Sequence, residues 1–427
     1  MKPLSARVVT AVCRAPRVFR RAVGRLAAAL VAALAASGVP AQAETDLPTA
    51  PVREEAASAP AAAPAAAPDR PAADLMETIH RIPVTVKNLF GREETRHIPL
   101  TVFRPAGDGP HPLVILSHGR AIASKRAQQG RQRFEAQARY LVSKGFVVIV
   151  PTRVGYGETY GDFDPEDSGG CNVMRLGPMS QAGSDQVLAA VAHARTLPYV
   201  DASRWVAMGN SVGGLITVAV AARNPPGLVA AINFSGGTGG NPENRPGDPC
   251  LPGNIERYWG GLAAQTALPM LWLYWQNDLY WGPDPPRRWA RAWEQGRGVV
   301  QFHQLPPVGA DGHSGMVADM DTWVPLVEAY LAQAGFTRSG LVTRPAASGF
   351  AAIGDADKVP TPQANRDTLY QRFLAAKAPR AFALGPQGAA GFATGDWALG
   401  RALGFCQARR GAPCRLYAVD DDIVWKP

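Results

Sequence analysis

The sequence predicts an α/β fold: a mostly parallel, doubly wound sheet opened by an antiparallel hairpin and followed by a small C-terminal α+β module. Three observations support this prediction. Short, continuously apolar runs alternate with helix-like stretches through the middle of the chain, two alternating segments precede them, and a Gly-x-Ser-x-Gly motif separates one run from one helical stretch. Strands that are apolar on both faces are typical of a parallel sheet covered by helices.

The first 43 residues predict a secretory signal. They contain seven Lys or Arg and no acid, an apolar core at 26–36, and small residues at 41–43 before Glu44. The alternative is a membrane anchor, but this core of about 11 residues is shorter than the roughly 20 needed to cross a bilayer. We expect cleavage after Ala43, a periplasmic or secreted protein, and no stable membrane insertion after cleavage.

The positive charge of the chain is concentrated in this signal. The net charge of +9 falls to +2 without the seven N-terminal cations. A nearly neutral mature chain gives no sign of a polyanionic partner. We therefore expect no nucleic-acid partner and favour a small-molecule substrate.

Composition divides the rest of the chain. Residues 44–76 read as a linker, because positions 47–73 hold 12 Ala and 6 Pro without a periodic apolar face. The main domain spans 77–337, a second polar linker spans 338–362, and a small module spans 363–427. Apolar runs and strand-like ends in this module suggest a β-α-β arrangement with a helix at 397–409. Its partner cannot be inferred from the residues.

The elements of the main domain follow in a regular order. Segments 82–87 and 97–103 alternate around Gly91, as two antiparallel strands do. The predicted parallel strands are 113–116, 146–150, 205–208, 228–234, 270–274 and 299–302. The predicted helices are 131–144, 181–195, 215–223, 286–295 and 317–334.

Two connections, 152–180 and 235–268, are longer than the roughly 2 to 6 residues typical of such loops. Each contains one cysteine. Without the signal, four cysteines remain, an even number that allows three pairings in an oxidising compartment. Sequence separation favours Cys171 with Cys250 and Cys406 with Cys414. We hypothesise that the first pair staples the two long loops into a rim over a pocket.

The motif at 209–213 predicts a nucleophile elbow with Ser211 at its tip. A bare G-x-S-x-G arises by chance in roughly one such glycine-rich chain in six. The segments on either side of the motif must therefore show whether it is a nucleophile elbow. An apolar run precedes it and a helix-like stretch follows it. Gly209 and Gly213 leave out side chains that would collide where a strand reverses into a helix.

A serine nucleophile needs a base and an acid, in the chain order serine, acid, histidine for this fold. Asp278 closes an apolar strand and is the predicted acid, since Asp284 lies in a proline-rich turn and Asp311 is too close to the histidine loop. His313 lies in a glycine-flanked loop after the last strand and is the predicted base. His303, within that strand, is the competing histidine. No histidine pair has the spacing of zinc ligands.

The oxyanion of the intermediate needs two donors. Val212, directly after the nucleophile, offers one backbone amide. The second is assigned to the amide of Arg120, in the Ser-His-Gly-Arg segment that follows the first parallel strand. His118 and Gly119 form this oxyanion loop, with His118 orienting it. Among the aromatic residues beside the acid, Tyr280 and Trp281 are candidates for the pocket wall.

The sequence resembles the dienelactone hydrolase-like branch of the α/β-hydrolase superfamily across 82–336. The resemblance is carried by Ser-His-Gly at 117–119, the 209–213 motif, Asn277-Asp278 and Gly312-His313. It implies hydrolysis of carboxylic esters or lactones without a metal or organic cofactor. The namesake enzymes use a cysteine nucleophile, whereas Ser211 points to serine esterases of this fold. The alternatives are a small amidase or peptidase with the same triad, and a noncatalytic envelope-binding protein.

Overall fold

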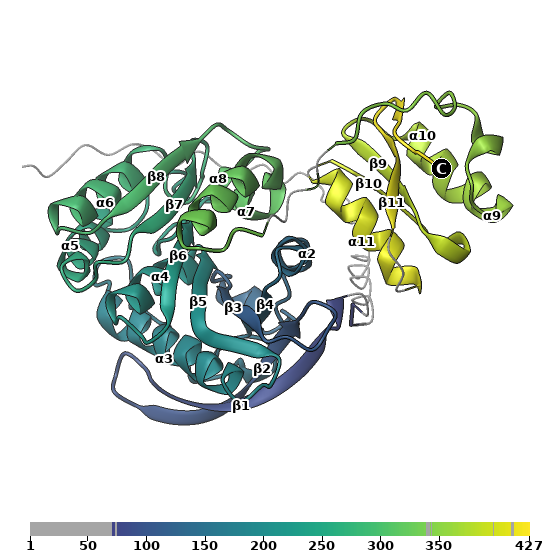
Figure 1. Cartoon of the computed structure of the whole chain (residues 1–427). Helices are drawn as coiled ribbons and strands as arrows, with labels where there is room; N and C mark the ends of the chain where they lie inside the picture. The colour runs from purple at the N-terminus through teal and green to yellow at the C-terminus, as the bar shows by residue number, and fades with distance from the viewer. Residues whose placement is uncertain (1–70, 73–74, 339–341, 343, 396, 411–413) are drawn as a thin grey trace, which may run out of the picture. The chain divides into compact units, whose positions relative to one another are not determined.

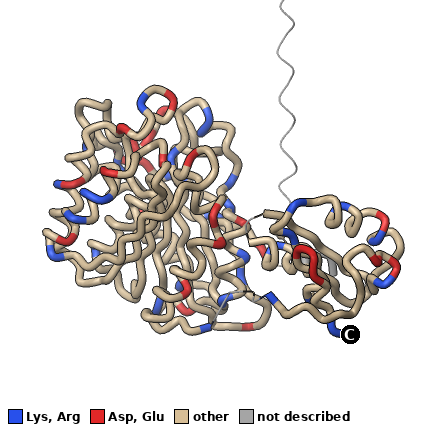
Figure 2. The backbone as a smooth tube through the Cα atoms, turned by 90° about the horizontal axis from the view of Figure 1, so that it is seen from above, with Lys and Arg blue, Asp and Glu red and all other residues tan. Residues whose placement is uncertain are grey.

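The computed structural model describes residues 71–72, 75–338, 342, 344–395, 397–410 and 414–427. The predicted signal at 1–43 and most of the linker at 44–76 lie outside these residues. Among the helices of the described residues, none combines the length and the apolar character that a bilayer span requires. Lys and Arg are interspersed with Asp and Glu over the described backbone (Figure 2).

An eight-stranded sheet forms the main domain, in the order β1-β2-β4-β3-β5-β6-β7-β8. β1 pairs antiparallel with β2, β2 pairs antiparallel with β4, and the remaining neighbours are parallel. This order defines the α/β-hydrolase fold and confirms the predicted hairpin and parallel sheet. The strands are β1 (Thr78–Lys87), β2 (Glu93–Phe103), β3 (His111–Ser117), β4 (Val147–Pro151), β5 (Val200–Asn210), β6 (Leu228–Phe234), β7 (Met270–Trp275) and β8 (Val300–Leu305).

Helices cover both faces of this sheet (Figure 1). Successive strand residues point to opposite faces, so Val114 packs in one buried cluster while Leu113 and Ile115 pack in the other. The first cluster lies under α2 (Glu135–Ser143) and α8 (Met320–Gln333). The opposite face is covered by α3 (Leu176–Ala194), α4 (Val212–Ala222), α5 (Pro252–Ala263) and α6 (Asp284–Gln295).

Several predicted element bounds need correction. α3 begins at Leu176 rather than at 181. α2 begins at Glu135 rather than at 131, because Phe134 has φ 49° and its left-handed backbone cannot continue a helix. The long connection predicted at 235–268 is present, but it contains a helix that was not predicted, α5. Ile255, Trp259 and Ala263 recur every four residues on the buried side of α5, so the periodic signal was present.

The C-terminal part contains a four-stranded antiparallel sheet in the order β10-β9-β11-β12, rather than a simple β-α-β unit. Its strands are β9 (Arg380–Leu384), β10 (Ala390–Thr394), β11 (Arg415–Val419) and β12 (Asp422–Ile423). One cluster packs under α11 (Ala398–Arg410), and another packs around η5 (Arg366–Tyr370) and α10 (Gln371–Ala375), which follow α9 (Gln363–Asn365). Val359, from the predicted linker at 338–362, is buried in this second cluster.

Both disulfides have the predicted pairing. Cys171 joins Cys250 across 79 positions, and Cys406 joins Cys414 across 8 positions. The first bond connects the loop after β4 to the loop after β6, and the second connects α11 to the start of β11. Both parts of the fold therefore carry a covalent link of the kind formed in oxidising compartments.

Candidate active site

Ser211 lies in the turn between β5 and α4, with φ 57° and ψ −123°. A non-glycine residue rarely adopts this backbone, which costs on the order of 1–3 kcal/mol and is typical of functional sites. The flanking glycines make the turn possible. A Cβ at Gly209 would lie 2.2 Å from the carbonyl oxygen of Gly213, and one at Gly213 would lie 2.2 Å from the carbonyl oxygen of Ser117. The motif has the geometry of a nucleophile elbow.

Asp278 follows β7 and is almost completely buried, at 1% exposure. Its Oδ1 accepts the backbone N–H of Tyr280 at 2.8 Å and of Trp281 at 3.2 Å. His313 Nδ1 lies 3.0 Å from Oδ2 and 3.1 Å from Oδ1. Because a carboxylate only accepts, these contacts fix the proton of His313 on Nδ1 and leave Nε2 free to accept.

Two polar residues hold the histidine loop against the acid. Asp311 Oδ1 accepts the backbone N–H of His313 and of Leu279, each at 2.9 Å. Asn277 donates from Nδ2 to the carbonyl of Val308 at 3.1 Å, and its Oδ1 accepts the Val308 N–H at 3.0 Å. Asp311 therefore shapes the loop, as its proximity to His313 suggests, and Asn277 ties the acid turn to the same loop.

The imidazole of His313 is held between aromatic rings. Tyr280 stacks on it with 3.9 Å between ring centroids, and Trp281 meets it edge-on at 5.3 Å. Trp281 is fixed in turn, because its indole N–H donates to the Ser235 carbonyl at 2.7 Å. Tyr280 and Trp281 also line a cavity with Ser211. Among the described side chains, the hydrogen bonds of the His313 ring go to Asp278, and none joins the ring to Ser211 Oγ.

The alternative acid and base lie elsewhere. Asp284 begins α6 and pairs with Arg287 one turn later, at 3.5 Å. His303 lies within β8, and Asp278 bonds to His313 instead. The geometry therefore selects Asp278 and His313 from the candidates in the sequence.

The predicted oxyanion loop lies against the nucleophile. A Cβ at Gly119 would be 3.1 Å from the Ser211 Cβ and 3.6 Å from its Oγ. Among the described residues, the amides of Gly119, Arg120 and Ala121 donate to no protein acceptor. Ser211 provides no side-chain cap to α4, whose first amide belongs to Val212. Backbone donors from both segments thus remain free beside the serine, as an oxyanion site requires.

His118 orients this loop and does not contact the serine through a hydrogen bond. Its Nδ1 donates to the Gly119 carbonyl at 2.7 Å, and its Nε2 accepts the Arg153 N–H at 3.1 Å. Burial, aided by the charge of Arg153, holds the pKa of His118 well below its ordinary value. His118 is therefore a neutral structural link between the oxyanion loop and the end of β4.

The cavity at Ser211 has a volume of about 450 Å³. Its walls come from the loop after β3, from 167–169 in the loop after β4, and from 238–243 in the loop after β6. The last two loops are the ones joined by Cys171 and Cys250. The structure thus supports the hypothesis of a stapled rim around the pocket.

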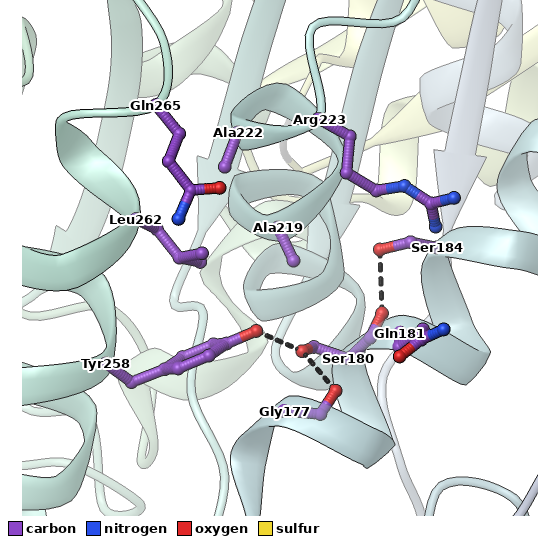
Figure 3. A pocket seen from close by; sticks show the side chains of 10 residues that line it. All are labelled: Gly177, Ser180, Gln181, Ser184, Ala219, Ala222, Arg223, Tyr258, Leu262 and Gln265. Atoms are coloured by element: carbon purple, nitrogen blue, oxygen red, sulfur yellow. Dashed lines mark hydrogen bonds between the residues drawn. The ribbon is translucent and has the colours of Figure 1, made fainter.

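A second hollow, of about 380 Å³, lies between α3, α4 and α5 (Figure 3). Ser180 of α3 hydrogen-bonds there with the hydroxyl of Tyr258 from α5. None of the predicted catalytic residues lines it. The cavity that Ser211 lines is therefore the candidate active site.

Sequence reasoning missed the charged cluster beneath the oxyanion loop. Arg153 and Glu166 are both fully buried, and Arg153 Nε donates to Glu166 Oε1 at 2.5 Å. Tyr156 also donates to Glu166, at 3.1 Å. The available signal was the position of Arg153, which follows β4 at the catalytic edge.

The family model described as the dienelactone hydrolase family matches residues 127–249. The match covers less than a third of the chain and includes Ser211, whereas Asp278 and His313 lie beyond it. Over these residues the resemblance expected from the motifs is confirmed. A comparison with curated proteins finds no match.

Solved structures include similar proteins at low identity. A putative dienelactone hydrolase from Klebsiella pneumoniae is 20% identical, with 60% of this chain and 99% of that chain covered and a TM-score of 0.38. The acylaminoacyl peptidase from Pyrococcus horikoshii is 16% identical, with coverages of 60% and 41% and a TM-score of 0.42. A putative dipeptidyl aminopeptidase IV from Bacteroides ovatus is 17% identical, with coverages of 60% and 36% and a TM-score of 0.41. The chain spans about two fifths of the length of these two peptidases.

Proposed function

We propose that this chain, whose residues 127–249 match a hydrolase family, is an exported serine hydrolase that cleaves carboxylic esters or lactones. Ser211 Oγ attacks the ester carbonyl while His313 Nε2 takes its proton. Asp278 holds the imidazole and stabilises the cation that forms. The amides of Val212 and Arg120 stabilise the negative charge on the carbonyl oxygen.

The intermediate then collapses to an acyl-enzyme. His313 returns its proton to the departing alkoxide, which leaves as an alcohol. Water attacks the acyl-enzyme in the second half-reaction, with His313 as the base, and releases the carboxylic acid and free Ser211. In a lactone, the alcohol and the acid stay joined in one ring-opened product.

The observation that carries this proposal is the hydrogen bond from His313 Nδ1 to the buried carboxylate of Asp278, at 3.0 Å. It leaves Nε2 as the acceptor, next to the two rings that share a cavity with Ser211. A noncatalytic binding protein has no need for this tautomer. The family description, which names a lactone hydrolase, favours an ester over an amide substrate.

The test is labelling of the purified mature protein with a fluorophosphonate, together with turnover of p-nitrophenyl butyrate. We expect one label on Ser211 in the wild-type protein and none in Ser211→Ala, with loss of turnover in the variant. Butyryl p-nitroanilide is the matched amide. Faster cleavage of the anilide than of the ester would assign an amidase, and equal labelling of both proteins would favour the binding protein.

Export is supported by the two disulfides, which are typical of oxidising compartments. We propose that the first 43 residues direct secretion and are removed after Ala43. Mass spectrometry of the protein purified from the secreting cell should give Glu44 as its first residue. An N-terminus upstream of the apolar core at 26–36 would reject cleavage.

A further inference from the structure

The pocket wall that carries the predicted oxyanion donor has little backbone support of its own. It comprises residues 119–126, between the end of β3 and the end of the short α1 (Ala123–Arg126). The amides at 119–121 bond to no protein acceptor among the described residues. The backbone bonds within this wall run from Lys125 and Arg126 to the Ile122 carbonyl, so side-chain contacts are needed to hold the Arg120 amide.

One carboxylate, that of Asp164, anchors both ends of this wall. Arg120 donates to it from both terminal nitrogens, Nη1 to Oδ1 at 3.1 Å and Nη2 to Oδ2 at 2.5 Å. Arg126 donates from Nη1 to Oδ2 at 2.7 Å. A two-pronged contact between guanidinium and carboxylate sets orientation as well as distance. The residues between these anchors include Ala121, Ile122 and Lys125, which line the cavity at Ser211.

Asp164 is itself tied to the buried cluster at the end of β4. Its Oδ1 accepts the backbone N–H of Glu166 at 3.2 Å, and Glu166 pairs with Arg153 in the fully buried interior. The backbone N–H of Arg153 in turn bonds to His118 at the start of the oxyanion loop. The carboxylate thus connects both ends of the 119–126 wall to the buried pair of Arg153 and Glu166.

The charge state of Asp164 suits this role. Burial opposes its ionisation, but the hydrogen bonds and charges of Arg120 and Arg126 hold its pKa below the ordinary value. Its side chain is 21% exposed and does not line the cavity with Ser211. Asp164 therefore stays ionised at neutral pH without touching the reacting atoms.

We propose that Asp164 is a positioning residue, which holds the Arg120 amide at the oxyanion through its bonds to Arg120 and Arg126. This inference rests on the proposed serine hydrolase function. Its consequence is specific: loss of Asp164 weakens stabilisation of the transition state and leaves binding of the ground-state ester almost unchanged.

The test compares wild-type protein, Asp164→Asn, Asp164→Glu and the control Asp185→Asn, which breaks the ion pair between α3 and Arg223 at the end of α4. Removing one oxyanion donor typically lowers kcat by about 100- to 1000-fold. A displaced donor should cost less, so for Asp164→Asn we expect kcat for p-nitrophenyl butyrate to fall about 10- to 100-fold, with KM within about threefold. The inhibition constant of a trifluoromethyl ketone should rise by the same factor as kcat/KM falls.

Two further readouts separate positioning from general stability. Hydrogen exchange of the amides at 119–126 should speed up in Asp164→Asn and stay unchanged in Asp185→Asn. Asp164→Glu, which keeps the charge, should recover part of kcat. If Asp164→Asn does not fold, Arg126→Gln removes one end of the anchor instead. The proposal then predicts that this variant lowers kcat and leaves KM almost unchanged.

The outcomes are distinct. A folded Asp164→Asn with wild-type kcat, or with a rise in KM alone, would overturn the role of Asp164 while the serine hydrolase remains. A wild-type protein that neither turns over esters nor takes the fluorophosphonate would reject the proposed function, and this inference with it.

Discussion

The ring of Tyr280 covers one face of the His313 imidazole, with 3.9 Å between centroids. Such aromatic contacts contribute about 0.5–1.5 kcal/mol. We expect Tyr280→Leu to lower kcat about two- to tenfold, because the imidazole loses its stacking partner when it becomes charged. Tyr280→Phe keeps the ring and should retain most of the activity. Steady-state kinetics on the three proteins check this, and equal losses in both variants would assign the effect to the hydroxyl.

The turn at Ser211 requires glycine at position 213, because any side chain there would collide with the backbone. A Cβ there would meet the backbone carbonyl oxygens of Ser117 and His118 at 2.2 and 2.5 Å. We expect Gly213→Ala to lower the melting temperature and abolish labelling of Ser211. The matched control is Gly261→Ala in α5, where a Cβ has open space. That change should stabilise the protein by about 0.5–1 kcal/mol, since alanine favours a helix. Equal melting temperatures for the two variants would contradict the clash.

The residues of the candidate triad were predictable because each follows a strand or sits in a glycine-flanked loop at the edge where such sheets bind substrate. Asp164 and Glu166 were not. Asp164 meets Arg120 across 44 positions, and Glu166 meets Arg153 across 13 positions of an irregular loop. The sequence of a loop has no periodic pattern that indicates which residues meet. These contacts can therefore be identified only in the folded structure.

The hairpin strand β1 is joined to α3 by a histidine pair. His80 Nδ1 lies 2.8 Å from His193 Nε2. Burial lowers the pKa of both rings from 6.5, and for His80 the charge of His193 adds to the effect. The folded protein therefore binds fewer protons than the unfolded chain just below pH 6.5, and the free energy of unfolding falls as the pH drops through this range.

Substitution of one ring tests this pH dependence. In His193→Gln, a polar partner for His80 remains while one titrating group is removed, so the melting temperature should fall less between pH 7 and pH 5.5 than in the wild-type protein. His97→Gln, at an exposed position of β2, is the control and should follow the wild-type curve. Parallel curves for all three proteins would show that the pair does not control acid stability.

The long, continuously apolar strands were predicted well because burial on both faces leaves a strong compositional signal. Element ends were less predictable. The left-handed backbone at Phe134 makes α2 begin later than predicted, and no residue type in this segment indicates it. β10 was missed because its sequence, Ala-Gly-Phe-Ala-Thr, is rich in residues with weak strand preference, and its pairing with β9 alone defines it.

The bond between Cys171 and Cys250 joins two loops that both line the cavity. Closing a loop of 79 positions is expected to stabilise the fold by on the order of 4 kcal/mol. The double variant Cys171→Ser/Cys250→Ser should therefore melt at a lower temperature and show a higher KM for p-nitrophenyl butyrate. Cys406→Ser/Cys414→Ser is the matched control, for which we expect no change in KM. An unchanged KM in the first double variant would show that the staple does not shape the pocket.

The convergence of three distant segments at one sheet edge is tested most directly by a crystal structure of the fluorophosphonate adduct. We expect phosphorus bonded to Ser211 Oγ, its free oxygen facing the amides of Val212 and Arg120, and His313 Nε2 within hydrogen-bonding distance of the serine oxygen. An adduct on another residue, or one on Ser211 with its oxygen in solvent and His313 out of reach, would contradict the assignment.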